Sequence, residues 1–228
     1  MRKLTMLFSL TLFGFYLIIP INGFTENPNV PDSLQYLQED YKTTELLPFD
    51  CKGWSIHEKI FNPMFEEKNI SSVIEVGVFL GNWTLSIAKK LPEDGVFYAI
   101  DHWEGSIEHQ EEDHPQNSYL PTLYEQFLSN ILHKGFENVV VPVKMDSLKA
   151  ARLLRRQKIQ VDLVYIDASH DYNSVLRDLH AWLPMVKKGG ILCGDDWHWG
   201  GVRQAVINFA EIKKFKIYSE GNFWMYEM

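Results

Sequence analysis

The run from Val73 to Thr84 constrains this chain more than any other feature. Its residues, VIEVGVFLGNWT, change from an apolar, β-branched stretch to a glycine-containing turn and then to a sequence compatible with a helix. Glu75, Gly77 and Gly81 have the spacing acid-x-Gly-x-x-x-Gly, which differs from the dinucleotide pattern G-x-G-x-x-G. A carboxylate here would repel a pyrophosphate and favour a ligand with positive charge, which glycines allow the backbone to approach closely. The run therefore predicts a strand, a ligand-binding turn and a helix, although many α/β proteins have such turns for structural reasons alone.

The rest of the chain alternates between strand and helix patterns. Strands are expected at 72–78, 96–101, 139–144, 161–167, 190–194, 214–219 and 223–226, and helices at 54–69, 83–91, 122–133, 147–157, 172–186 and 202–212. This order predicts an α/β fold with a doubly wound, mostly parallel seven-stranded sheet that ends in an antiparallel hairpin. Ligands bind such sheets outside the carboxyl ends of the strands.

Length and charge limit the classes of function. A chain of 228 residues with 46% hydrophobic content favours one sizeable core. The net charge of -8 opposes nucleic-acid binding, which needs clustered lysine and arginine. The two cysteines, Cys51 and Cys193, form no metal-like cluster, and Cys193 lies in an apolar run typical of a buried thiol.

The amino terminus differs from the remainder. Arg2 and Lys3 precede an apolar stretch from Leu4 to Ile21, which predicts a signal peptide over residues 1–23 or, if uncleaved, a membrane anchor. We therefore expect a secreted or periplasmic protein, with membrane anchoring as the alternative. Residues 24–52 are expected to be a linker and amino-terminal extension, followed by a single domain over 53–228.

Acidic residues follow two of the early strands. Asp101 ends the second strand, where a carboxylate can accept both hydroxyls of a cofactor ribose. Asp146 and Ser147 follow the third strand and could border an adenine, but a helix N-cap explains this pair equally well.

A second acidic group follows the fourth and fifth strands. Neighbouring strands would bring together Asp167, Asp195 and Asp196, and an all-oxygen set of this kind suits Mg²⁺ or Mn²⁺ better than zinc. Alternatively, individual acids cap helices or bind arginine. His170 lies three residues after Asp167, where its imidazole could take a proton from a substrate hydroxyl.

The polar segment 103–121 is expected to be a lid or substrate loop. Its side chains Glu108, His109 and His114 could contact substrate or a second metal, although solvent exposure explains them more simply. Tryptophans near strand ends could stack on a sugar or aryl ring, whereas core packing explains Trp224 at least as well; they are Trp103, Trp197, Trp199 and Trp224.

Four ordered stretches carry a family resemblance over about residues 54–228, beginning with the run from Glu75 to Gly81. The others are IDHWEGSIEH from Ile100 to His109, and IDASHDY from Ile166 to Tyr172 together with GDDW from Gly194 to Trp197. Together they resemble the metal-dependent branch of class I S-adenosylmethionine (SAM) methyltransferases, which includes catechol and macrolide-sugar O-methyltransferases.

The resemblance implies roles for the residues that match. Glu75, Gly77, Gly81 and Asp101 would bind SAM, the three aspartates would hold Mg²⁺ or Mn²⁺, and His170 would be the base for methyl transfer to a sugar or small phenolic hydroxyl. An export signal is unexpected for an enzyme that uses a cytosolic cofactor, so an exported, non-catalytic binding protein is the alternative. A nicotinamide oxidoreductase is disfavoured because G-x-G-x-x-G is missing from the first turn.

Overall fold

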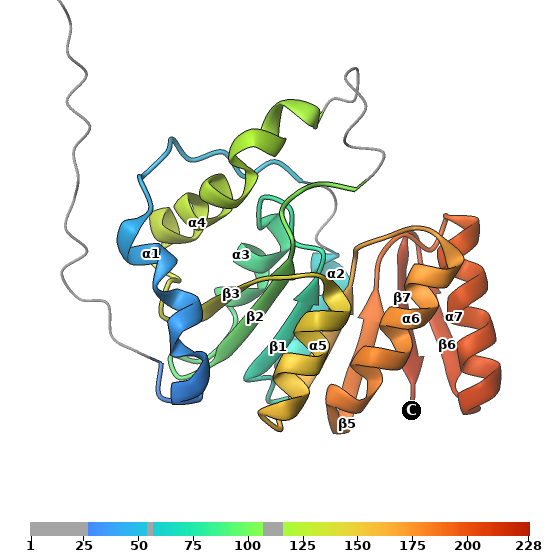
Figure 1. Ribbon diagram of the computed structural model, residues 1–228. Coiled ribbons are helices and arrows are strands. Elements are labelled where there is room, and N and C mark those ends of the chain that lie inside the picture. Colours follow the sequence, from blue (N-terminus) through green and yellow to red (C-terminus); the bar gives the residue numbers. More distant parts are fainter. Residues whose placement is uncertain (1–26, 54–56, 107–115) are drawn as a thin grey trace, which may run out of the picture.

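The computed structural model describes residues 27–53, 57–106 and 116–228 (Figure 1). Its strands are β1 (Ser72–Val76), β2 (Val96–Asp101), β3 (Val140–Lys144), β4 (Val161–Ile166), β5 (Val186–Gly194), β6 (Lys216–Glu220) and β7 (Phe223–Glu227). Its α-helices are α1 (Asp40–Thr43), α2 (Glu58–Glu67), α3 (Asn82–Ala88), α4 (Leu123–Lys134), α5 (Ser147–Arg156), α6 (Tyr172–Trp182) and α7 (Gly200–Lys213). Short 3₁₀ helices are η1 (Asp32–Gln38), η3 (Asn117–Thr122) and η4 (Leu183–Met185). No helix in these ranges is both long and apolar enough to cross a bilayer.

The seven strands form one sheet in the order β3-β2-β1-β4-β5-β7-β6. Strands β1 to β5 pair in parallel, and β7 is antiparallel to both β5 and β6. The predicted doubly wound sheet with a terminal hairpin is therefore confirmed. The strand order reverses between β1 and β4, and this switch point is where open α/β sheets bind ligands.

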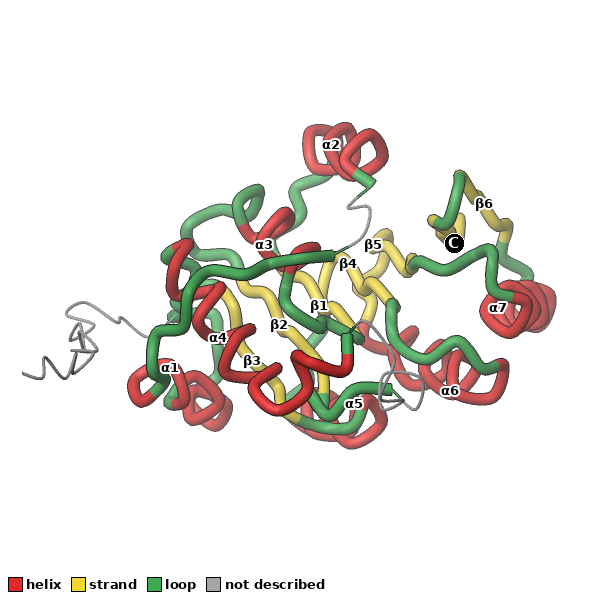
Figure 2. The backbone as a smooth tube through the Cα atoms, turned by 90° about the horizontal axis from the view of Figure 1, so that it is seen from above, coloured by secondary structure: helices red, strands yellow, loops and turns green. Residues whose placement is uncertain are grey.

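Strand alternation divides the core between the two faces of the sheet. On one face, Ile74 and Val164 pack against η1, α5, α6 and α7. On the other, Val73 and Leu163 pack against α2, α3 and α4. Figure 2 shows α2 and α3 on one side of the strands and α5 and α6 on the other. Both faces of the central strands are covered, so these strands read as continuous apolar runs.

The structure differs from the expected elements in three places. The segment expected to be a linker contains η1 and α1, in which Leu34 and Tyr41 are fully buried. Helix α2 ends at Glu67, two residues before the expected end of the helix 54–69, and it continues through Pro63. Strand β5 begins at Val186 rather than Gly190, because Val186 already pairs with Val161 of β4. Short helices and strands with exposed starts have weak periodicity, so sequence patterns miss them.

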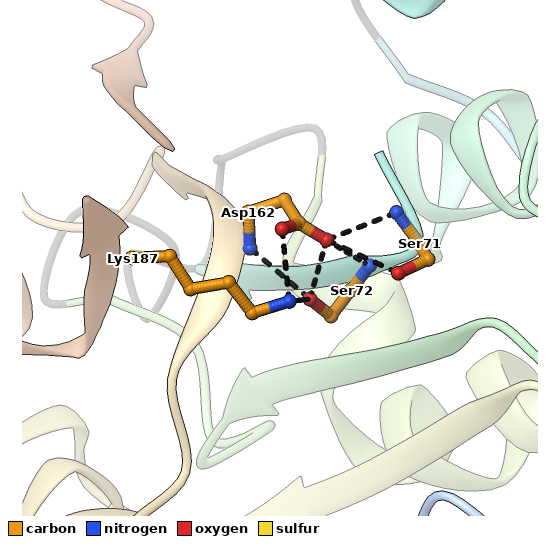
Figure 3. Close-up of polar contacts among 4 residues, drawn as sticks. All are labelled: Ser71, Ser72, Asp162 and Lys187. Carbon is orange, nitrogen blue, oxygen red and sulfur yellow. Dashed lines mark hydrogen bonds and ion pairs between the residues drawn. The ribbon is translucent and has the colours of Figure 1, made fainter. Parts of the chain in front are cut away.

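A polar cluster joins the amino ends of β1, β4 and β5 (Figure 3). The carboxylate of Asp162 accepts hydrogen bonds from the backbone nitrogens of Ser71 and Ser72 at 3.0 and 2.9 Å. It also accepts one from Lys187 Nζ at 2.8 Å. Partial burial opposes ionisation, but the hydrogen bonds from Lys187, Ser72 and Ser71 outweigh it and lower the pKa of Asp162 to about 2.

We predict that this cluster stabilises the fold in a pH-dependent way. The folded pKa of Asp162 lies below its usual 3.8, so its contribution is present above that pH and is lost as the pH falls towards 2. Asp162→Asn should lower the free energy of unfolding by about 1 to 2 kcal/mol near neutral pH, a value reduced for solvent screening.

Denaturant titrations over a pH series measure this effect. The difference between parent and Asp162→Asn should narrow below the usual aspartate pKa, while the exposed control Glu66→Gln should differ little from the parent throughout. A difference that stays constant down to the folded pKa would contradict the assigned ion pair.

Candidate functional site

The turn after β1 brings two strand ends into close contact. Gly77 has φ +88° and Gly81, the N-cap of α3, has φ +84°, a left-handed conformation that favours glycine. A Cβ on Gly77 would lie 1.9 Å from the backbone oxygen of Asp167, and a Cβ on Gly81 would lie 2.9 Å from the ring of Phe127. Glycine is therefore required at both positions by packing within the chain, whether or not a ligand is bound.

A cavity of about 640 Å³ lies at the carboxyl ends of the strands, a size suited to a small organic ligand. It is lined by nine of the ten predicted site residues: Glu75, Gly77, Asp101, Asp146, Ser147, Asp167, His170, Asp195 and Asp196. The tenth, Gly81, does not line it, although its neighbours Leu80 and Asn82 do. The sheet topology thus gathers into one cavity residues that are up to 121 positions apart.

Glu75 lies beneath helix α3 and is 2% exposed. It accepts a 2.5 Å hydrogen bond from Thr84 Oγ1. Burial raises the pKa of Glu75 well above its usual value, Thr84 opposes this, and the charges of Asp167 and Asp101 add to the increase. A cationic ligand nearby would stabilise the carboxylate, in agreement with the charge argument from the sequence.

Asp101 organises the backbone around the cavity. Its Oδ2 accepts hydrogen bonds from the nitrogens of Val78 and Phe79 at 2.8 and 3.0 Å, and its Oδ1 accepts one from the nitrogen of Trp103 at 2.8 Å. A carboxylate offers about four acceptor positions, so roughly one remains for a ligand. This geometry differs from the expected acceptance of both ribose hydroxyls by Asp101.

Asp146 and Ser147 make the contacts of a helix start. Asp146 is the N-cap of α5 and accepts from the nitrogens of Leu148 and Lys149 at 3.1 and 3.3 Å. Ser147 Oγ donates to Asp178 at 2.5 Å and accepts from Trp182 Nε1 at 2.9 Å. The N-cap alternative from the sequence is thus present, and the position of both residues on the cavity wall leaves contact with a ligand open.

Asp167, Asp196 and His170 form a polar group beside the Gly77 turn. The carboxyl groups of Asp167 and Asp196 lie close to each other, and His170 Nε2 lies 2.9 Å from Asp196 Oδ2. Burial and the charges of Asp195 and Asp196 raise the pKa of Asp167 well above its usual value. Asp196 has φ +63°, and a left-handed non-glycine residue beside a cavity is typical of functional sites.

Asp195, the third predicted metal ligand, faces a different partner. Its Oδ2 lies 3.1 Å from His57 Nε2 and 3.3 Å from the hydroxyl of Tyr165. Burial opposes ionisation, but the hydrogen bond and charge of His57 lower the pKa of Asp195. In β5, Cys193 belongs to the α2 side of the sheet, and Asp195 continues that alternation towards His57, which precedes α2. Asp195 and the following Asp196 consequently point to different partners.

The described residues contain no group of three or more histidine, cysteine or carboxylate side chains arranged to hold a metal. The predicted set of three aspartates is therefore only partly assembled: Asp167 and Asp196 are in contact, while Asp195 is paired with His57. Mg²⁺ commonly binds through one or two carboxylates and keeps several waters, so the pair of Asp167 and Asp196 fits this ion.

Three residues upstream of β1 belong to the site although the sequence did not indicate them, namely Lys52, Gly53 and His57. His57 falls within the expected helix 54–69, and no pattern in the sequence indicates its left-handed φ of +48°. Lys52 and Gly53 line the cavity, and the segment that carries them is held by Asn130, whose Nδ2 donates to the oxygens of Asp50 and Leu80. Burial raises the pKa of the Cys51 thiol to about 12, which disfavours a nucleophilic role.

The aromatic candidates separate into core and cavity residues. Trp103 and Trp224 are buried, and their indole nitrogens donate to the oxygens of Phe79 and Asp195. Trp199 is 44% exposed, lines the cavity and stacks on the His170 ring with centroids 4.5 Å apart. Glu108, His109 and His114 lie outside the described residues.

Relatives in sequence include methyltransferases from plants. A candidate caffeoyl-CoA O-methyltransferase of Arabidopsis thaliana is 32% identical over 133 residues, covering 58% of this chain and 49% of the relative. The caffeoyl-CoA O-methyltransferase of Stellaria longipes is 26% identical over 175 residues, covering 75% of this chain and 65% of the relative. The chain thus spans about half to two thirds of the length of these curated relatives.

The fold is shared with solved methyltransferase structures. An O-methyltransferase from Bacillus cereus in complex with SAH has a TM-score of 0.58 at 16% identity, covering 87% of this chain and 91% of that one. The model of a family described as a methyltransferase domain matches residues 74–197, more than half of the chain. The chain therefore belongs to this methyltransferase-domain family, in agreement with the class I resemblance found in its sequence.

Proposed function

We propose that this chain is a SAM-dependent, cation-assisted O-methyltransferase that acts on a small phenolic acceptor. One observation carries the proposal: a glycine turn with an acidic strand end and an aspartate-histidine pair share one cavity of about 640 Å³. A non-catalytic binding protein is not favoured, because Asp196 and His170 are still in contact, as a reactive pair requires. A small sugar acceptor is the second candidate, supported by the resemblance to macrolide-sugar enzymes.

The cofactor would occupy the part of the cavity next to β1 and β2. The Gly77 turn and the remaining acceptor position of Asp101 would bind it, and the carboxylates around Glu75 would stabilise its positive charge. When bound, SAM supplies an activated methyl group for in-line transfer. The chain therefore has to provide orientation and proton removal rather than a covalent intermediate.

The acceptor would bind beside Asp196, His170 and Trp199. Asp167 and Asp196 would hold Mg²⁺, which lowers the pKa of a hydroxyl bound to it. Asp195 would become a third ligand of this ion only if its carboxylate turned away from His57. His170 would take the hydroxyl proton, since it touches Asp196 and is held in place by stacking on Trp199. The exposed indole of Trp199 would suit an aryl ring, and the named activity of the plant relatives favours a phenolic acceptor over a sugar.

We predict that Asp101→Asn weakens SAM binding. Removing the charge would weaken both the hydrogen bond to the ribose and the turn that Asp101 organises, with an expected loss of about 1.5 to 3 kcal/mol. Calorimetry with SAM and its demethylated product measures this loss. The matched control is Asp94→Asn. Asp94 is exposed and precedes the first residue of β2, at the end of the strand far from Asp101, so this substitution should leave the affinity for SAM unchanged. Equal affinities for parent and Asp101→Asn would remove the ribose assignment.

Substitutions should distinguish the role of the metal ligand Asp196 from that of the base His170. Asp196→Asn should abolish methyl transfer that depends on Mg²⁺ while sparing SAM binding, because Asp196 contacts Asp167 and His170, whereas the cofactor is assigned to the Gly77 turn and Asp101. His170→Ala should slow transfer by about 10² to 10⁴-fold, with partial recovery at higher pH as hydroxide replaces the base. The control His180→Ala removes an exposed histidine of α6 that packs on Phe209 of α7 and does not line the cavity, and it should retain full activity.

Methyl transfer to a panel of phenolic and sugar acceptors, with and without chelator, tests both roles. Loss of activity on chelation and its return with Mg²⁺ would support the proposed cation. Activity indifferent to chelator, or His170→Ala as fast as the parent, would show that the acidic group is structural and that the proposed mechanism is wrong.

A further inference from the structure

Helix α5 and the residue pair that follows it carry a run of exposed basic residues. From Ser147 to Lys158 the sequence SLKAARLLRRQK contains five cations and no acid. All five are exposed, namely Lys149, Arg152, Arg155, Arg156 and Lys158, and we call them the α5 basic face. The opposite side of the helix buries Ala150, Ala151 and Leu154 against the sheet. The basic residues therefore lie on the outer surface of the molecule.

These cations are not used within the fold. Among the described parts of the chain, none of the five makes an ion pair, in contrast to Lys187, which binds Asp162, and Lys89, which lies 3.6 Å from Glu58. The whole chain carries a net charge of -8, so a local group of five positive charges runs against its composition. Such a surface attracts an anionic partner by charge complementarity.

The amino-terminal part of the chain joins the fold at the same end as the carboxyl end of α5. Asn27 Nδ2 donates to the oxygens of Gly95 and Asn138, which precede β2 and β3. Helix α5 runs from the carboxyl end of β3 back to the start of β4, so its last turn also lies at the amino ends of the strands (Figure 1). Ser33 Oγ of η1 donates to Gln157 Oε1 at 2.9 Å, which places η1 beside this last turn.

The residues before Asn27 include the apolar stretch from Leu4 to Ile21, which is near the lower length limit for spanning a bilayer. Arg155, Arg156 and Lys158 of the basic face belong to the last turn of α5 and the residues after it, at the end of the domain where the chain enters at Asn27. An apolar segment and a basic surface are the two signals that together hold a protein at a membrane. The candidate cavity opens at the opposite end, where the strands terminate.

We propose that the α5 basic face docks on a membrane surface of anionic phospholipids, with the candidate cavity directed away from the bilayer. Under the membrane-anchor alternative for residues 1–23, the apolar amino-terminal segment brings the chain to the lipid, and the basic face selects anionic headgroups and sets the orientation of the domain. Each cation near an anionic surface strengthens the interaction roughly fivefold. The docked protein would then take its acceptor from the aqueous side.

Arginine footprinting of the full chain tests the orientation without any substitution. The protein is reconstituted in nanodiscs of phosphatidylcholine alone or with added phosphatidylglycerol, and then treated with phenylglyoxal. Labelling of Arg152, Arg155 and Arg156 should fall at least about threefold in the anionic discs and recover at high salt, which screens surface charge. The exposed Arg203 on α7 is an internal control and should not change.

Equal labelling in both kinds of disc would overturn the proposal, as would a decrease of the same size at Arg203. Added RNA or an acidic peptide should not protect the three arginines in neutral discs. Protection by either to the same extent as phosphatidylglycerol would assign the face to that partner and exclude the lipid surface.

A matched pair of variants tests how much the arginines of α5 contribute to membrane binding. Binding is measured by flotation with vesicles that contain phosphatidylglycerol. Arg152→Gln/Arg155→Gln/Arg156→Gln should reduce the preference for anionic over neutral vesicles by roughly fivefold for each charge removed. The control Arg203→Gln/Lys213→Gln/Lys214→Gln removes the same charge from α7 and should retain the preference. An equal loss in both variants would show a general charge effect and contradict docking by α5. The footprint decides the question if either variant fails to fold.

Discussion

A side chain at position 77 would place its Cβ 1.9 Å from the backbone oxygen of Asp167, and this contact determines the geometry of the candidate site. The turn after β1 and the loop after β4 can meet only if residue 77 is glycine with positive φ. Their contact spans the switch point of the sheet, where the strand order reverses. The expected cofactor turn and the acidic group therefore share one cavity. Gly201 in α7 is constrained in the same way, because a Cβ at this position would lie 2.3 Å from the backbone oxygen of His170. Helix α7 can therefore approach the loop after β4 closely only with glycine at position 201.

Negative charge is the second constraint on the site. Among the described residues that line the cavity, seven are carboxylic acids and a single one is lysine, Lys52. Burial and mutual repulsion raise the pKa of Glu75 and Asp167, whereas His57 lowers the pKa of Asp195. Two carboxylates thus lie against histidines, Asp195 against His57 and Asp196 against His170, whereas the raised pKa values of Glu75 and Asp167 indicate that their negative charge is poorly balanced within the fold. A cationic cofactor near Glu75 and a divalent cation near Asp167 would balance that charge at two separate points.

The fold and most of the cavity could be predicted from the sequence, because regular patterns determine both. Alternating apolar runs defined the strands, and acids that follow parallel strands must lie at one edge of the sheet, so nine of ten predicted residues line one cavity. The partners of these side chains could not be predicted. Strand alternation already indicates that the consecutive residues Asp195 and Asp196 face different ways, but their partners His57 and His170 lie just before α2 and in the loop after β4, where no periodic pattern places them. Likewise, the three backbone hydrogen bonds to Asp101 depend on local turn geometry that leaves no periodic signal.

Segments upstream of β1 connect the two ends of the molecule. At the amino ends of the strands, η1 packs beside α5, and Asn27 binds the turns before β2 and β3. The chain then passes along α4, where Ser129 and Asn130 bind the oxygens of Leu47 and Asp50, and reaches the cavity at Lys52 and Gly53. His57 further along contacts Asp195, so the chain from Asn27 to His57 links the amino ends of the strands to the acidic side of the cavity. Because this path crosses the full height of the sheet, a membrane attachment at its start would place the lipid and the acceptor at opposite ends of the domain.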